Sequence, residues 1–309
     1  MTSSAIAVSG LRKAYGDKTV LDGIDFEVRM GTVFSLLGPN GAGKTTTVNV
    51  LTTLQKADAG TVRVAGHDVA TETRAVRAVL GVTGQFAAVD ELLTGRENLE
   101  LMADLKRVSR RVVAPLLERF ELADAGTKLV SAYSGGMRRK LDLAMTLVGD
   151  PRIIFLDEPT TGLDPRSRRT MWAIVRELVA DGVTIFLTTQ YLDEADQLAD
   201  RIAVLDHGHL VAQGTSEELK RQIPGSHVRL RFADFATLDA AARIFADATR
   251  DDDELSLRVP GDGGSKALRS LLDRLGENAL EAEEFSVHTP DLDDVFLALT
   301  GRASAEVTA

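Results

Sequence analysis

The chain contains no cysteine among its 309 residues. That absence excludes disulfides, thiol nucleophiles and thiolate metal sites, and it fits a reducing compartment. Long apolar runs are also missing: stretches such as Ile153 to Leu156 are far shorter than the ~20 residues that a membrane-spanning helix needs. The first ten residues, MTSSAIAVSG, have no basic segment ahead of an apolar core and therefore do not indicate a secretory signal. We expect a cytoplasmic protein without a membrane span of its own.

Positive charge is in deficit, with 36 Lys and Arg against 46 Asp and Glu and a net charge of -10. No global positive field attracts nucleic acid, so nucleic acid is not an expected partner. The composition is otherwise that of a globular protein, and the length allows one large domain with a smaller companion.

A glycine-rich stretch follows the apolar run Val33 to Leu37, which is typical of a buried strand. It matches the pattern G-x-x-x-x-G-K-[ST], in which backbone N–H groups and a helix N-terminus cradle phosphates. The lysine would reach the outer phosphates, and the following threonine would offer its hydroxyl to Mg²⁺. The residues concerned are Gly38, Pro39, Asn40, Gly41, Ala42, Gly43, Lys44, Thr45 and Thr46.

A second buried-strand pattern, Ile153 to Leu156, ends in two carboxylates. Asp157 would sit at the strand tip, where it can hold Mg²⁺ opposite Thr45, and Glu158 can polarise the attacking water. Two adjacent acids could instead begin a loop. The phosphate loop upstream makes this alternative the less favoured one.

Ser134-Gly135-Gly136 precedes apolar positions spaced as one face of a helix, which predicts a helix N-terminus suited to a phosphate. An ordinary serine cap explains the same pattern. The basic run Arg138 to Lys140 is interpreted as a solvated face rather than a nucleic-acid patch. Thr94 and Glu97 have capping-box spacing and predict another helix start.

Five further residues have less support from spacing. Gln85 and Gln190 each follow a predicted strand, where an amide can reach a nucleotide or its metal. Tyr15 stands beside a turn, either as a half-buried strand tyrosine or as an adenine-stacking ring. His207 and His209 flank a glycine and indicate a hairpin turn rather than a metal pair.

Taken in order, these motifs resemble the ATP-binding subunit of an ATP-binding-cassette (ABC) transporter over about residues 5 to 222. The resemblance implies that residues 38 to 46 form Walker A and that the ligands of Mg²⁺ are Thr45, Gln85 and Asp157. It also implies that Ser134 begins the signature, that Asp164 belongs to the D-loop and that Tyr15 stacks on adenine. The tail TPDLDDVFLALTG, the form YSGGM and the run TTQYLDEAD are similar to the drug-export subfamily of daunorubicin-resistance type.

The sequence departs from the family pattern in two motifs. The signature has Tyr133 and Met137 in place of Leu and Gln, although the serine and both glycines are present. Gln190 stands where the family has a histidine that contacts the γ-phosphate. Glutamine can donate a hydrogen bond but cannot shuttle a proton near neutral pH.

The expected fold is α/β: a P-loop NTPase of ABC type with a mainly parallel sheet, an antiparallel β subdomain and a helical signature subdomain at about 90–150. We place this ATP-binding domain at 1–223 and a small accessory α/β domain at 224–309, with Pro224-Gly225 as the boundary. Near the C-terminus, Thr289 is expected to cap a helix whose first turn carries acids; a metal loop is the alternative.

The resemblance implies an ATPase that powers export through a separate permease at the cytoplasmic face of a bacterial membrane. Because each motif occurs once and the signature completes a facing subunit's ATP site, a homodimer is expected. The competing readings are a soluble ATP-driven clamp and a nucleotide-dependent regulator. The missing coiled coil and the acidic charge disfavour the clamp, and Glu158 disfavours the regulator.

Overall fold

The computed structural model describes residues 4–306 except 86, 223–225, 262–263 and 289. Two compact units are present, Met1–Ser216 and Glu217–Ala309, and each is described by itself. The predicted boundary at Pro224-Gly225 lies outside the described residues. Among the residues that are described, no helix is both long and apolar enough to cross a bilayer.

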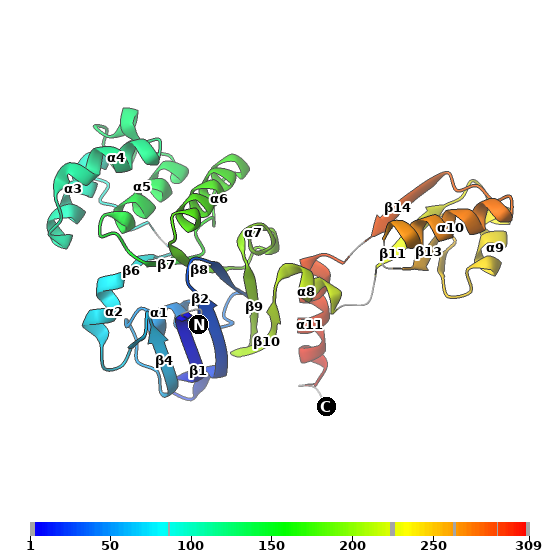
Figure 1. Cartoon of the computed structure of the whole chain (residues 1–309), viewed down its shortest axis with the longest axis horizontal. Helices are drawn as coiled ribbons and strands as arrows, with labels where there is room; N and C mark the ends of the chain where they lie inside the picture. The colour runs from blue at the N-terminus through cyan, green and yellow to red at the C-terminus, as the bar shows by residue number, and fades with distance from the viewer. Residues whose placement is uncertain (1–3, 86, 223–225, 262–263, 289, 307–309) are drawn as a thin grey trace. The chain divides into compact units, whose positions relative to one another are not determined.

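The first unit begins with an antiparallel sheet of order β2-β1-β4-β5 (Figure 1). Its strands are β1 (Ser4–Tyr15), β2 (Lys18–Arg29), β4 (Ala59–Val64) and β5 (His67–Asp68). Burial alternates along β2 from Ile24 to Arg29, as expected for a strand with one face on the core, and is less regular along β1. The predicted antiparallel start of the chain is therefore present.

The central sheet has six strands in the order β10-β9-β3-β8-β7-β6. The neighbours from β9 to β6 pair in parallel, and β10 alone pairs antiparallel. Because parallel strands share one carboxyl edge, every loop that leaves β3, β6, β7 or β8 begins on the same side of the sheet. The strands are β3 (Val33–Leu37), β6 (Leu80–Thr83), β7 (Ile153–Asp157), β8 (Thr184–Thr189), β9 (Arg201–Asp206) and β10 (His209–Gly214).

Two apolar layers cover the central sheet. On one face, Phe34 and Phe186 stack at 5.5 Å and meet Phe26 of β2, which joins the two sheets of the unit. On the other face, Ile154 and Leu156 pack with helix residues. Burial on both faces explains why the central strands are continuous apolar runs in the sequence.

Helices surround this core, and Figure 1 shows α3, α4 and α5 grouped together, as predicted for the stretch near 90–150. Thr94 caps α3 in a complete capping box with Glu97, as its spacing predicted. The helices of the unit are α1 (Lys44–Leu51), α2 (Thr73–Val79), α3 (Gly95–Lys106), α4 (Val113–Arg119), α5 (Gly135–Leu147), α6 (Pro165–Ala180) and α7 (Leu192–Leu198); α8 (Ser216–Arg221) crosses into the next unit. Short 3₁₀ turns occupy Arg110–Val112, Ala123–Ala125 and Val130–Ala132.

The second unit has the order β-α-β-β-α-β and an antiparallel sheet of order β12-β13-β11-β14. This is the split β-α-β arrangement of ferredoxin-like domains. Its elements are β11 (His227–Arg231), α9 (Phe235–Ile244), β12 (Thr249–Asp251), β13 (Ser256–Pro260), α10 (Ser265–Glu277), β14 (Glu284–His288) and α11 (Leu292–Glu306).

The predicted fold class is confirmed, with local corrections. The capping side chain of α11 is Asp291, which accepts from the Asp294 N–H at 2.9 Å, rather than Thr289, which lies outside the described residues. The sequence predicts a helix over Lys44 to Leu54 after the glycine-rich loop, whereas α1 ends at Leu51; α2, β12 and β14 were not predicted. The His207-Gly208 turn joins β9 to β10 with both residues at positive φ, which confirms the hairpin.

Candidate functional site

The glycine-rich loop joins β3 to α1 and runs too close to its neighbours to admit side chains at two positions. A Cβ on Gly38 would lie 2.2 Å from the carbonyl oxygen of Leu205. At Gly43, whose φ is +114°, a Cβ would lie 2.7 Å from the Leu21 side chain. Both glycines are therefore required for the loop to curl over the carboxyl end of β3.

Lys44 begins α1 and has its ammonium group buried at the loop. The Nζ donates to the carbonyl oxygens of Gly38 at 2.8 Å and Pro39 at 3.1 Å, and it lies 3.2 Å from Glu158 Oε1. The ammonium group thus has two hydrogen bonds to the main chain and one close carboxylate. The structure thus brings Lys44, which follows β3, next to Glu158, which follows β7.

Asp157 and Glu158 leave β7 at the carboxyl edge, beside this lysine. The Thr188 hydroxyl of β8 donates to Asp157 Oδ1, and the Glu158 N–H donates to the Thr188 carbonyl oxygen at 3.1 Å. Glu158 has a φ of +49°, an uncommon conformation for a non-glycine residue that neighbouring contacts must hold. The Thr161 hydroxyl, 3.3 Å from Glu158 Oε2, supplies one such contact.

Gln190 and Gln85 leave the same edge of the sheet. Gln190 directly follows Thr189, whose carbonyl oxygen accepts from the Gly38 N–H at 3.2 Å, so it starts beside the glycine-rich loop. Gln85 follows β6 after one intervening residue and is exposed. The parallel topology therefore places both amides at the carboxyl edge that carries the carboxylates.

Tyr15 lies at the end of β1, and 45% of the side chain is exposed. Its hydroxyl donates to Gln55, and the Lys13 Nζ is 5.5 Å from the ring centroid. Thr45 and Thr46 occupy the first turn of α1, where Thr45 is exposed. These side chains remain open to a ligand.

The Ser134 segment is at the N-terminus of α5, as predicted, with its hydroxyl accepting from the Met137 N–H at 3.3 Å. A Cβ on Gly136 would lie 2.7 Å from the Ser167 hydroxyl, so this end of α5 packs against the start of α6. Asp164 caps α6 and accepts from the Ser167 N–H at 3.0 Å. Within the described part of the chain, no hydrogen bond or ion pair joins Ser134 to the glycine-rich loop.

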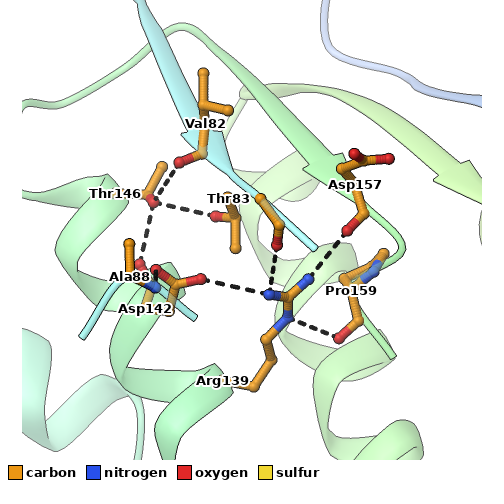
Figure 2. A network of polar contacts seen from close by, with 9 residues as sticks. Val82, Thr83, Ala88, Arg139, Asp142, Thr146, Asp157 and Pro159 are labelled. Atoms are coloured by element: carbon orange, nitrogen blue, oxygen red, sulfur yellow. Dashed lines mark hydrogen bonds and ion pairs between the residues drawn. The ribbon is translucent and has the colours of Figure 1, made fainter. Parts of the chain in front are cut away.

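The interpretation of residues 138 to 140 as a solvated face is wrong for Arg139. That side chain is buried and donates to main-chain carbonyl oxygens at the ends of β6 and β7 (Figure 2). The burial of Arg139 depends on which face of α5 packs against the sheet. A three-residue basic run by itself indicates solvent exposure.

A second buried charge was also missed. Glu194 of α7 is fully buried and accepts from the Thr160 hydroxyl at 2.8 Å and from the Trp172 indole N–H at 3.1 Å. Burial raises the pKa of this carboxyl above its usual range. Glu194 thus links the turn after β7 to α6 and α7. The sequence did not predict its burial, because Glu194 follows the exposed acid Asp193.

The phosphate-loop geometry and the carboxylates at the sheet edge agree with comparisons to known proteins. Residues 21–161 match the family model "ABC transporter", and residues 214–300 match "ATP-binding protein DrrA1-3-like, C-terminal domain". The nucleotide-free structure of an ATP-binding cassette from an ABC transporter has a TM-score of 0.65 and 26% identity, covering 71% of this chain and 94% of its own. The structure of an ABC transporter's ATP-binding subunit has a TM-score of 0.64 and 29% identity over 71% and 92%. The chain belongs to the ATP-binding subunits of ABC transporters and is an ABC-type ATPase.

Full-length relatives define the subfamily. The daunorubicin resistance ATP-binding protein DrrA3 of Streptomyces coeruleorubidus is 51% identical, with 97% of each chain covered. The daunorubicin/doxorubicin resistance ATP-binding protein DrrA of Streptomyces peucetius is 49% identical over 96% and 92%. The Nod factor export ATP-binding protein I of Burkholderia orbicola is 38% identical over 98% and 99%. Within the ABC ATPases, the chain therefore belongs with the daunorubicin-resistance ATP-binding proteins.

Proposed function

We propose that this chain binds ATP with Mg²⁺ and hydrolyses it to drive export of a drug-like compound through a separate membrane permease. The observation that carries the chemistry is the placement of Lys44 and Glu158 3.2 Å apart beside Asp157 at the end of the central sheet. A cation for phosphate and a carboxylate for water are thereby held on one rigid edge.

The loop and the carboxylate edge fit a magnesium nucleotide. Gly38 and Gly43 let the loop curl tightly, and such a loop ahead of a helix N-terminus suits phosphates, of which Lys44 would contact the outer ones. Asp157 and Thr45 offer the oxygen ligands that Mg²⁺ prefers, with Gln85 as a further ligand from the β6 exit. When bound, Mg²⁺ would neutralise phosphate charge during transfer. Tyr15 would stack on the adenine ring.

Glu158 is the proposed general base, held by Thr188 and Thr161 with its carboxylate toward Lys44. Gln190 would donate to the γ-phosphate from the exit of β8. Neither the base role of Glu158 nor the donor role of Gln190 requires a histidine.

The second partner is a copy of this chain. Ser134, Gly135 and Gly136 present a helix N-terminus that no described contact joins to the chain's own phosphate loop. We propose that they complete the facing subunit's ATP site, with Asp164 at the subunit boundary. The pair would act at the cytoplasmic face of a bacterial membrane, with residues 1–223 as the nucleotide domain and residues 224–309 as an accessory domain.

Export is favoured over other ABC functions because the full-length relatives are named for drug resistance and Nod factor export. The test is a cell that expresses this chain with a candidate membrane permease and is loaded with daunorubicin. We expect Lys44→Ala to abolish both MgATP hydrolysis and drug efflux, while Lys128→Ala, at an exposed position, changes neither. Hydrolysis and ATP-dependent dimers without any efflux would favour the soluble clamp, and unchanged ATP binding by Lys44→Ala would refute the site.

A further inference from the structure

Arg139 is the buried cation of the first unit that the proposed chemistry does not use. Its side chain is 7% exposed, and its guanidinium donates to three main-chain carbonyl oxygens. The distances are 2.6 Å to Gly84, 3.2 Å to Asp157 and 2.9 Å to Pro159. These acceptors belong to two segments, the exit of β6 and the turn that carries the carboxylate pair (Figure 2).

Burial of this charge costs free energy, so the contacts must repay its desolvation. Desolvation lowers the pKa of Arg139 below its usual range, and the nearby Asp142 carboxylate opposes the shift. Guanidinium has five N–H donors in a rigid plane and can bridge acceptors from both segments at once. A lysine ammonium at the same position would keep the charge but would have a single donor centre.

Asp142, one turn further along α5, extends the same contact. Its Oδ2 lies 3.5 Å from Arg139, and its Oδ1 accepts from the Ala88 N–H at 3.1 Å. Gly84 precedes Gln85 by one residue and Ala88 follows it by three, so α5 holds the chain on both sides of Gln85. The Thr146 hydroxyl, which lies 3.1 Å from that of Thr83, adds a polar contact to the end of β6.

We propose that Arg139 is a positioning residue for ATP hydrolysis, holding the Gln85 segment and the Asp157–Glu158 turn in one arrangement against α5. The proposal rests on the proposed roles of Gln85 and Glu158, and it assigns Arg139 no contact with the nucleotide. Because α5 begins at the signature Ser134, the same arginine links the signature helix to both groups. A change in Arg139 is therefore expected to disturb turnover more than ATP affinity, which Lys44 and the glycine-rich loop govern.

The first test is a kinetic comparison of Arg139→Lys and Arg139→Met with wild type. Arg119→Met serves as the matched control, because Arg119 forms a surface ion pair with Asp181 at 2.6 Å. We expect both Arg139 variants to lower kcat by about 10- to 100-fold, as misplacement of catalytic groups does, with ATP affinity within about threefold of wild type. Arg119→Met should match wild type in both quantities.

The second test reads position directly and does not require turnover. Since the chain has no cysteine, Ala87→Cys introduces a unique thiol beside Gln85 whose maleimide labelling rate reports the exposure of the segment. We expect Arg139→Lys in this background to label severalfold faster than Ala87→Cys alone, measured at a temperature well below the melting temperature of both variants. Arg119→Met in the same background should leave the rate unchanged.

Wild-type kcat together with wild-type labelling in Arg139→Lys would overturn the proposal, as would equal losses of kcat and ATP affinity. If Arg139→Met does not fold, Arg139→Lys still decides, since it retains the charge and the side-chain stem. A wild-type chain that hydrolyses no ATP would refute the proposed function instead, and the labelling comparison would still test the positioning role.

Discussion

Replacement of Glu158 by glutamine tests the proposed base and the buried ion pair together. In the structure, the Lys44 ammonium donates to two carbonyl oxygens and lies 3.2 Å from the Glu158 carboxyl group. An incoming phosphate therefore competes with these three groups for the ammonium. Glu158 is the acidic member of the three, and a carboxylate competes for a lysine more strongly than a neutral carbonyl oxygen does.

The expected magnitudes follow from this geometry. A hydrogen bond to a charged group contributes about 1.5 to 3 kcal/mol and a neutral one about 1 kcal/mol. Glu158→Gln keeps an acceptor for Lys44 but removes its charge. The side chain then competes with phosphate for Lys44 less strongly by about 1 kcal/mol, so ATP affinity should rise by about fivefold. Hydrolysis should fall by about 10² to 10⁴, because the amide cannot take a proton from water.

The assay pairs equilibrium MgATP binding with single-turnover hydrolysis, followed by gel filtration for an ATP-dependent dimer. Glu118→Gln, an exposed acid-to-amide change on α4, is the matched control and should behave as wild type. Normal turnover by Glu158→Gln would show that another group acts as base. Weaker ATP binding would refute the idea that the carboxylate competes with phosphate for Lys44.

Two further predictions concern groups near the ends of β8 and β7. Gln190→Ala should lower turnover through the loss of one donor, at a cost of about 1 to 3 kcal/mol, whereas Gln190→His should stay active and gain a pH step near 6.5; wild-type rates for Gln190→Ala at every pH would exclude Gln190 from the chemistry. For Glu194, burial raises the folded pKa, so the unfolded state binds fewer protons and stability falls as pH rises from the unfolded pKa through the folded one. The melting temperature of Glu194→Gln relative to wild type should therefore increase as pH rises above the usual range of a carboxyl pKa, and a difference that stays constant with pH would show that Glu194 does not titrate in this way.

Local sequence was sufficient to predict the motifs and the strand or helix that accompanies each of them. The phosphate loop, the carboxylate pair after Leu156 and the Ser134 cap each depend on a few adjacent residues with a strand before or a helix after them. Such signals survive because buried parallel strands must be apolar throughout and helix starts need a capping group. The same reasoning predicted the Thr94 capping box and the α/β class.

Contacts between distant segments could not be obtained in that way. Arg139 and Glu194 read as surface charges because their neighbours in sequence are charged, and only the packing of α5 and α7 against the sheet buries them. The cap of α11 was assigned two residues too early for a related reason, since Thr and Asp are both good caps and local preference does not choose between them.

The sequence by itself therefore determined which chemical groups this ATPase has: a lysine in a glycine-rich loop, two acids at a strand end and a serine at a helix start. Tertiary structure alone decided how they meet. The parallel sheet sets Lys44 beside Glu158, whose backbone has a positive φ, and Arg139 joins the β6 and β7 exits. The physical reason is that strand pairing and burial act between residues far apart in the chain, where local propensity carries no information.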